Sequence, residues 1–310
     1  MVGENTMNFT EEQKRIAVFL SSIGKVYTDT YLINGKTQKQ FVNAFDALTN
    51  FIVNYAFERS GAPPFFRQIA QDALVQIFNE ELVNFSEADA KTCWTLCLKM
   101  AGSRKLNKDL YPLNSNRSTG RNQGILNLMI EKNVLNIANW SIEFLKRDET
   151  KEIHHILKGV RGIGRKIASF YLRDLVWLKC ISESSLSEKQ FLQPIDLWVN
   201  RALKHSIGKR TGIDYRTPDH SYWKKAELIV QLCEESDCSP IGFNMGAWML
   251  GARISNGESD YRRILKDPTH TILKQRYQAL QEKTAELEKT FERTSRTKSS
   301  LAQILDSSNQ

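Results

Sequence analysis

The sequence has few cysteines, no long apolar run and no motif of a metal site. Its five cysteines are too few and too scattered along 310 residues to form a disulfide framework. Cys93 and Cys97 have no histidine pair near them in the sequence, so they do not have the spacing of a zinc site. The apolar stretch at 16–20 is too short for a secretory signal or a membrane span. We therefore expect an intracellular, cytoplasmic protein that uses no membrane, metal or cofactor.

The sequence also lacks the alternation of apolar and polar residues that is typical of strands. The spacing of its apolar residues predicts a succession of helices. All seven prolines fall where the helical spacing of apolar residues breaks. Thr10 and Ser86 each begin a pattern typical of a capping box, which predicts a helix after each of them. Further helices are predicted over about 38–59, 64–83, 120–131, 135–146, 151–159, 164–178, 196–207, 221–235 and 241–255. The predicted fold class is therefore all-α.

Positive charge exceeds negative charge and is unevenly distributed. Lys and Arg total 43 against 35 Asp and Glu, which gives a net charge of +8. Two loop-rich segments, 99–121 and 201–225, each carry a net charge of +5. Such a concentration is typical of a surface that binds the phosphates of nucleic acid. Solvated loops would give the same pattern, and charge alone does not decide between the two interpretations.

A glycine-rich turn separates two predicted helices in the segment 156–168, Ile-Leu-Lys-Gly-Val-Arg-Gly-Ile-Gly-Arg-Lys-Ile-Ala. Gly162 and Gly164 can adopt positive φ and have no Cβ, so consecutive amides can face a phosphate oxygen. The helix that follows directs the positive end of its dipole at the same anion. The pattern predicts a site for a phosphate backbone.

This segment resembles the helix-hairpin-helix of the DNA glycosylase superfamily that includes endonuclease III. In that family the second residue after the last hairpin glycine can be a catalytic lysine, and here it is Lys166. A second hallmark of the family is an aspartate at the start of a later helix. The run Pro-Ile-Asp-Leu-Trp-Val-Asn-Arg at 194–201 supplies Asp196. The resemblance covers about 40–255 and implies two helical subdomains around the hairpin.

The resemblance implies a role for each motif residue. Lys166 would be the nucleophile and Asp196 its electrostatic partner, while the amides of Gly162 and Gly164 hold DNA with the help of Arg165. The hairpin alone favours a Lys166 that only contacts phosphate, and Asp196 alone is typical of an N-cap. The presence of both residues favours the catalytic pair.

Arg161 stands where the relatives usually have proline, before the first hairpin glycine, and would add positive charge near the phosphate.

The separation of 30 residues between Lys166 and Asp196 resembles the long connection in the archaeal-type 8-oxoguanine DNA glycosylases. That branch lacks an iron–sulfur cluster. That resemblance implies that Trp94 and Trp248 sandwich the flipped base. Asn244 occupies the position at which that branch carries an aspartate that contacts the purine, a departure that weakens the assignment of 8-oxoguanine. Ordinary core packing is the alternative for both tryptophans.

These interpretations divide the chain into an N-terminal helical extension (1–37), a glycosylase domain (38–259) and a C-terminal helix with a tail (260–310). Apolar residues between Leu273 and Phe291 recur at three- and four-residue spacing, which predicts an extended helix. Packing on the body, self-association and recruitment of a protein partner all fit such a helix.

The expected function is a bifunctional DNA glycosylase and AP lyase. Its partner would be double-stranded DNA that contains a damaged base, with 8-oxoguanine as the first expectation, and its location would be nucleoid-associated. Two alternatives remain: a glycosylase for another damaged base, and a non-catalytic helix-hairpin-helix module that only binds DNA.

Overall fold

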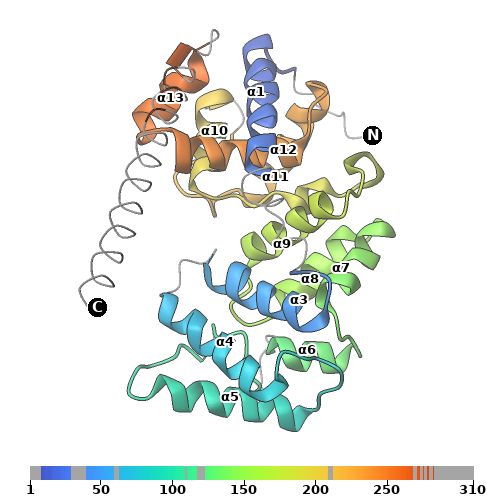
Figure 1. The fold of residues 1–310 in the computed structure, drawn as a ribbon. Coiled ribbons are helices and arrows are strands. Elements are labelled where there is room, and N and C mark those ends of the chain that lie inside the picture. The colour runs from blue at the N-terminus through green and yellow to red at the C-terminus, as the bar shows by residue number, and fades with distance from the viewer. Residues whose placement is uncertain are drawn as a thin grey trace, which may run out of the picture. The chain divides into compact units, whose positions relative to one another are not determined.

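The chain folds into a succession of helices, and the computed structural model confirms the predicted all-α class (Figure 1). It describes residues 8–28, 40–58, 63–108, 110–116, 123–208, 212–267, 271, 272, 275, 278 and 282. No strand occurs among these residues, and an isolated parallel bridge joins Gln123 to Val160.

The first helices are α1 (Glu11–Tyr27), α3 (Ala44–Asn50), the π-helical η2 (Phe51–Glu58), α4 (Pro64–Phe78), α5 (Glu87–Ala101), α6 (Ile125–Glu131) and α7 (Ile137–Lys146). They are followed by α8 (Thr150–Lys158), α9 (Arg165–Leu178), η3 (Glu183–Ser185), η4 (Lys189–Leu192), α10 (Leu197–Ser206), α11 (Tyr222–Glu235) and α12 (Pro240–Met249). The last described elements are η6 (Leu250–Ile254) and α13 (Glu258–Lys266).

Local chemistry explains where several helices begin and end. The side chains of Thr10 and Ser86 each cap the amide three residues ahead and complete the predicted capping boxes. Helix α4 ends at Phe78, before the predicted 83, because Asn79 adopts the left-handed conformation at φ 46°. The prediction over 38–59 began too early, since Asn43 caps α3.

The chain divides into two compact units, Met1–Met249 and Leu250–Gln310. The first of these units includes the predicted N-terminal extension (1–37) and ends ten residues before the predicted boundary at 259/260. The apolar repeat from Leu273 to Phe291 lies outside the described residues. None of the described helices has the length and apolar character needed to cross a bilayer.

Helices α1 and α12 approach closely because glycines lie between them. A Cβ on Gly24 would collide with the carbonyl of Gly242, and a Cβ on Gly246 would collide with the carbonyl of Leu20. The contact between α1 and α12 is more extensive than the contact between any other two of the described elements. Backbone contact of this kind cannot be relieved by a side-chain rotation, so α1 is fixed against α12.

We predict that Gly246→Ala destabilises the first unit by about 3 kcal/mol, because the new methyl group forces α1 and α12 apart. Urea unfolding measures the change. Ser22→Ala, on the exposed side of α1, is the control and should stay within about 0.5 kcal/mol of the parent. An equally small effect of Gly246→Ala would contradict the close approach.

Candidate functional site

The predicted hairpin lies between α8 and α9. Gly162 has φ +74°, and a Cβ there would collide with the carbonyl of Leu110. Gly164 has φ −81° and ψ 173°, extended backbone that any residue adopts, and a Cβ there would meet nothing within 4 Å. The expectation that both glycines use positive φ is therefore correct for Gly162 and wrong for Gly164.

The first turn of α9 offers backbone donors to an anion. Gly164 is the N-cap and makes no side-chain capping hydrogen bond. The first backbone bond of this turn is the one from the Ala168 amide to the Gly164 carbonyl, at 3.0 Å. The amides before Ala168 have no partner within the helix, and the helix dipole adds positive potential at the same place. This geometry suits a phosphate oxygen.

The positive charge of Lys166, 30 residues before Asp196 in the sequence, lies near enough to lower the pKa of the Asp196 carboxyl. Both side chains are half-buried. Asp196 is the N-cap of α10, and its Oδ1 accepts the amide hydrogen of Val199 at 2.9 Å. No ion pair within 4.0 Å joins the two charges in the described part of the chain.

The electrostatics of Asp196 combine opposing influences. Burial raises the pKa of its carboxyl above the ordinary value. The hydrogen bond from Val199 and the positive charges of Arg173 and Lys166 lower the pKa and partly offset that rise. Burial thus disfavours the charged form of the Asp196 carboxyl, while the positive charges of Arg173 and Lys166 stabilise it.

The segment that leads into Asp196 is fixed from α11 and α12. The Tyr222 hydroxyl accepts the amide hydrogen of Ile195 at 3.2 Å and donates to the carbonyl of Gln193 at 3.3 Å. Burial raises the pKa of Tyr222 to about 12, so its hydroxyl remains a donor at neutral pH. The Asn244 amide donates to the Pro194 carbonyl at 3.1 Å. Three successive residues before Asp196 are therefore held by side chains from other helices.

A buried ion pair in α9 organises this region. Arg173 and Asp174 are at most 1% exposed, and the guanidinium lies 2.7 Å from the carboxylate. Arg173 also donates to Asn244 at 2.9 Å and to the Tyr27 hydroxyl at 3.3 Å. Tyr55 donates to Asp174 at 3.0 Å. The pair thus joins α9 to α1, η2 and α12.

Arg173 and Asp174 are not among the site residues predicted from the sequence. Two adjacent charges inside the apolar stretch 167–178 are the signal that could have indicated them, because charged residues are seldom fully buried unless paired.

The structure does not support a direct base contact by Asn244. The side chain is 1% exposed. Its oxygen accepts from Arg173 and its nitrogen donates to Pro194, so the amide is already used. Asn244 positions the segment before Asp196 instead.

The prediction of added charge near the phosphate from Arg161 also needs correction. Arg161 is 4% exposed, and its guanidinium donates to the carbonyls of Lys108 at 3.3 Å and Asn116 at 2.8 Å. Its charge is turned into the protein, where it connects the hairpin to the segment 106–116.

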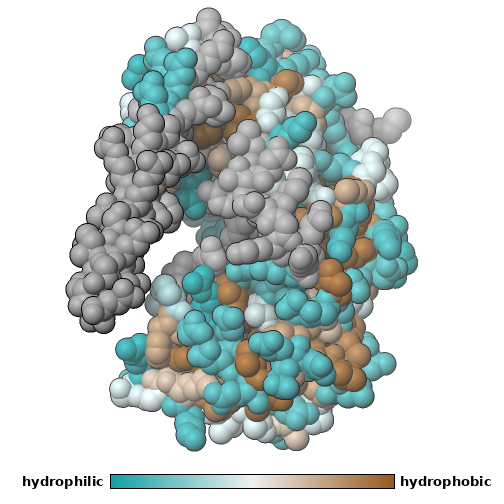
Figure 2. All heavy atoms as spheres, viewed as in Figure 1, coloured by the Kyte–Doolittle hydropathy of each residue, from teal (hydrophilic) through white to brown (hydrophobic). Residues whose placement is uncertain are grey.

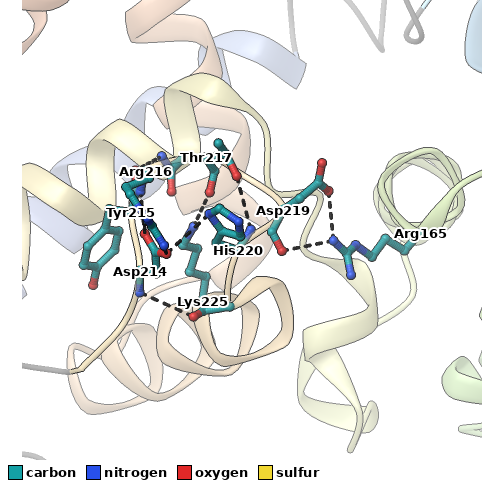
Figure 3. A network of polar contacts seen from close by, with 10 residues as sticks. Arg165, Asp214, Tyr215, Arg216, Thr217, Asp219, His220 and Lys225 are labelled. Carbon is teal, nitrogen blue, oxygen red and sulfur yellow. Dashed lines mark hydrogen bonds and ion pairs between the residues drawn. The ribbon is translucent and has the colours of Figure 1, made fainter.

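Arg165 is engaged by a neighbouring loop (Figure 3). Its guanidinium lies 2.9 Å from the Asp219 carboxylate and 4.4 Å from the centre of the Tyr222 ring. A phosphate that binds Arg165 must compete with Asp219.

The same loop contains part of the basic segment 201–225. Arg216 pairs with Asp214 at 2.6 Å, and the buried Lys225 donates to the Thr217 carbonyl at 2.7 Å (Figure 3). Burial lowers the pKa of Lys225 to about 8. Part of the positive charge counted in this segment is therefore used within the loop.

The two tryptophans predicted to sandwich a base have separate surroundings. Trp94 is 3% exposed in α5, and its ring centre lies 5.4 Å from that of Tyr111. Trp248 is half-buried in α12 and meets the Tyr27 ring edge-on at 5.5 Å. Figure 1 draws α5 well apart from α12. The structure does not bring the two rings together.

His154 joins the two helices of the hairpin. It is fully buried in α8, and its Nε2 donates to the Arg165 carbonyl at 3.1 Å. Burial lowers the pKa of His154 to about 4, so the ring is neutral at neutral pH. The contact fixes the start of α9, which carries Lys166.

Cys93 and Cys97 are buried in α5 beside Tyr111, and the contact with Cys97 together with burial raises the pKa of Cys93. Within the described ranges, no three His, Cys, Asp or Glu side chains converge in a way that could hold a metal ion.

Comparison of the chain with protein-family models, curated proteins and solved structures found no significant match.

We predict that Asp196→Asn preserves stability whereas Asp196→Ala costs about 1 kcal/mol, because asparagine caps a helix as well as aspartate does and alanine does not. Urea unfolding at neutral pH compares the two variants. Removing a charge that burial disfavours gives the Asn variant a further small gain. A loss as large in the Asn variant as in the Ala variant would contradict the capping role.

Proposed function

We propose that this protein is a DNA glycosylase and AP lyase that excises an oxidised purine, with 8-oxoguanine as the first candidate. Lys166 is the proposed nucleophile and Asp196 its electrostatic partner. The observation that carries the proposal is the proximity of these two residues at the starts of two helices. A purely DNA-binding hairpin has no need of a half-buried carboxylate within electrostatic reach of its lysine.

The arrangement suits the cleavage of an N-glycosidic bond. Positive charge develops on the sugar as that bond breaks, and a fixed carboxylate stabilises it. Asp196 is fixed by its capping bond to Val199 and by the side chains that hold 193–195. The absence of an ion pair between Lys166 and Asp196, within the residues described, leaves the amine uncommitted.

The proposed reaction proceeds through a Schiff base. The neutral amine of Lys166 attacks C1′, the bond from C1′ to the base breaks, and the base leaves with the electron pair and takes up a proton. Asp196 accepts the proton that the amine gives up. Ring opening forms an imine between Lys166 and C1′. Loss of a proton from C2′ then expels the 3′ phosphate by β-elimination.

The start of α9 is proposed to hold the DNA backbone next to the target nucleotide. The unpaired amides after Gly164 supply donors to a phosphate. Arg165 joins them once the phosphate displaces Asp219. The target base must leave the stack before Lys166 can reach C1′.

Borohydride trapping tests the proposal. Duplexes that contain 8-oxoguanine, an abasic site or undamaged guanine are incubated with the parent, Lys166→Gln, Asp196→Asn and Lys179→Gln. Lys179→Gln is a matched control, because Lys179 is an exposed lysine just past the other end of α9. We expect a covalent complex with the 8-oxoguanine duplex that is lost in Lys166→Gln and unchanged in Lys179→Gln.

Asp196→Asn should slow base excision by about 100-fold or more, since it removes the charge and keeps the cap. Trapping on the abasic duplex alone would retain the lyase and favour another damaged base. Binding of all three duplexes without any trapping would overturn the catalytic proposal in favour of a DNA-binding module.

A further inference from the structure

Helix α13, in the second unit, presents three positive charges on one face. Its exposed cations are Arg262, Arg263 and Lys266. The buried residues that fix the rotation of the helix are Tyr261, Ile264 and Leu265. Figure 2 shows hydrophilic residues over α13.

These three cations line one open hollow of about 600 Å³. The hydroxyl-bearing residues Ser259 and Thr271 line it as well. One acid, Asp267, is also in the lining, and its carboxylate accepts the amide hydrogen of Ile272 at 2.9 Å. Three cations and one acid leave the hollow with a net positive charge.

The three cations of the hollow lack an ion-pair partner among the residues that the structure describes. Across the ranges that the structure describes, no acid lies within ion-pair distance of Arg262, Arg263 or Lys266. Lys266 is four residues from Arg262 and three from Arg263, so the like charges are neighbours on the helix surface and repel each other. A bound anion would relieve this repulsion.

The chemistry of the hollow fits a phosphodiester better than a carboxylate. Two adjacent guanidinium groups can each bind two oxygens, and a lysine adds a point charge. Ser259 supplies a further donor to a non-bridging oxygen. An exposed hollow of this kind suits a backbone that passes across it.

We propose that the hollow formed by Arg262, Arg263 and Lys266 binds the phosphate backbone of nucleic acid, as a contact separate from the hairpin. The nucleic-acid part of this proposal rests on the function proposed above. Anion binding by the hollow rests on the three cations of α13 and does not depend on that function.

The test uses the full chain and an undamaged duplex of about 20 base pairs. Fluorescence anisotropy measures affinity as a function of NaCl concentration for the parent and for R262Q/R263Q/K266Q. Each lost phosphate contact should reduce the salt slope by about 0.9. We expect the affinity at about 100 mM NaCl to fall at least 10-fold and the slope to fall by about 1 to 3.

The matched control is K91Q/K151Q/K179Q, which removes three exposed lysines from the first unit. It changes the net charge by the same amount and should alter affinity by less than about 3-fold. A second arm titrates inorganic pyrophosphate into all three proteins by calorimetry, and the α13 variant should lose one binding site that the parent and the control both show.

Equal behaviour of the α13 variant and the control in both arms would overturn the proposal. Loss of pyrophosphate binding with unchanged duplex affinity would overturn the nucleic-acid assignment and indicate a free phosphorylated ligand. A parent that binds pyrophosphate but no duplex would contradict the proposed function and leave an anion site in α13.

Discussion

The pairing of Arg173 with Asp174 inside the first unit is the interaction on which the rest of the site depends. Breaking a buried ion pair costs about 3–5 kcal/mol, because the remaining charge has no solvent. Here the pair is also hydrogen-bonded to Tyr27, Tyr55 and Asn244. Three other elements are therefore fixed against α9. These side chains satisfy one another's hydrogen bonds, so the rotation of α9 about its own axis is fixed.

The fixed rotation of α9 determines where the residues of its first turn lie. The same helix that carries Arg173 in its middle carries Lys166 in its first turn, and His154 fixes that turn through the Arg165 carbonyl. Asn244 continues from the buried cluster to the segment that leads into Asp196. The positive charge of Arg173 also lowers the pKa of the Asp196 carboxyl. One polar cluster thus positions both residues of the proposed catalytic pair.

The sequence predicts what local interactions decide. The helices, the caps at Thr10 and Ser86 and the N-cap by Asp196 depend on residues within one turn, and the structure agrees with them. The place of Arg161 depends on carbonyls 45 and 53 residues away, and no local pattern specifies them. The position of α1 follows from glycines of α12 that face it across more than 200 residues of sequence, and no local pattern specifies that contact.

The proximity of Lys166 and Asp196 is the central claim, and it can be measured without any substrate. An NMR titration of ¹³C-labelled aspartate carboxyls gives the pKa of Asp196, assigned by the signal that Asp196→Asn removes. We expect the pKa of Asp196 to lie above that of an ordinary aspartate. It should rise further in Lys166→Gln, because an attractive positive charge is lost, and it should not change in Lys179→Gln. An ordinary pKa that does not respond to Lys166→Gln would contradict the account.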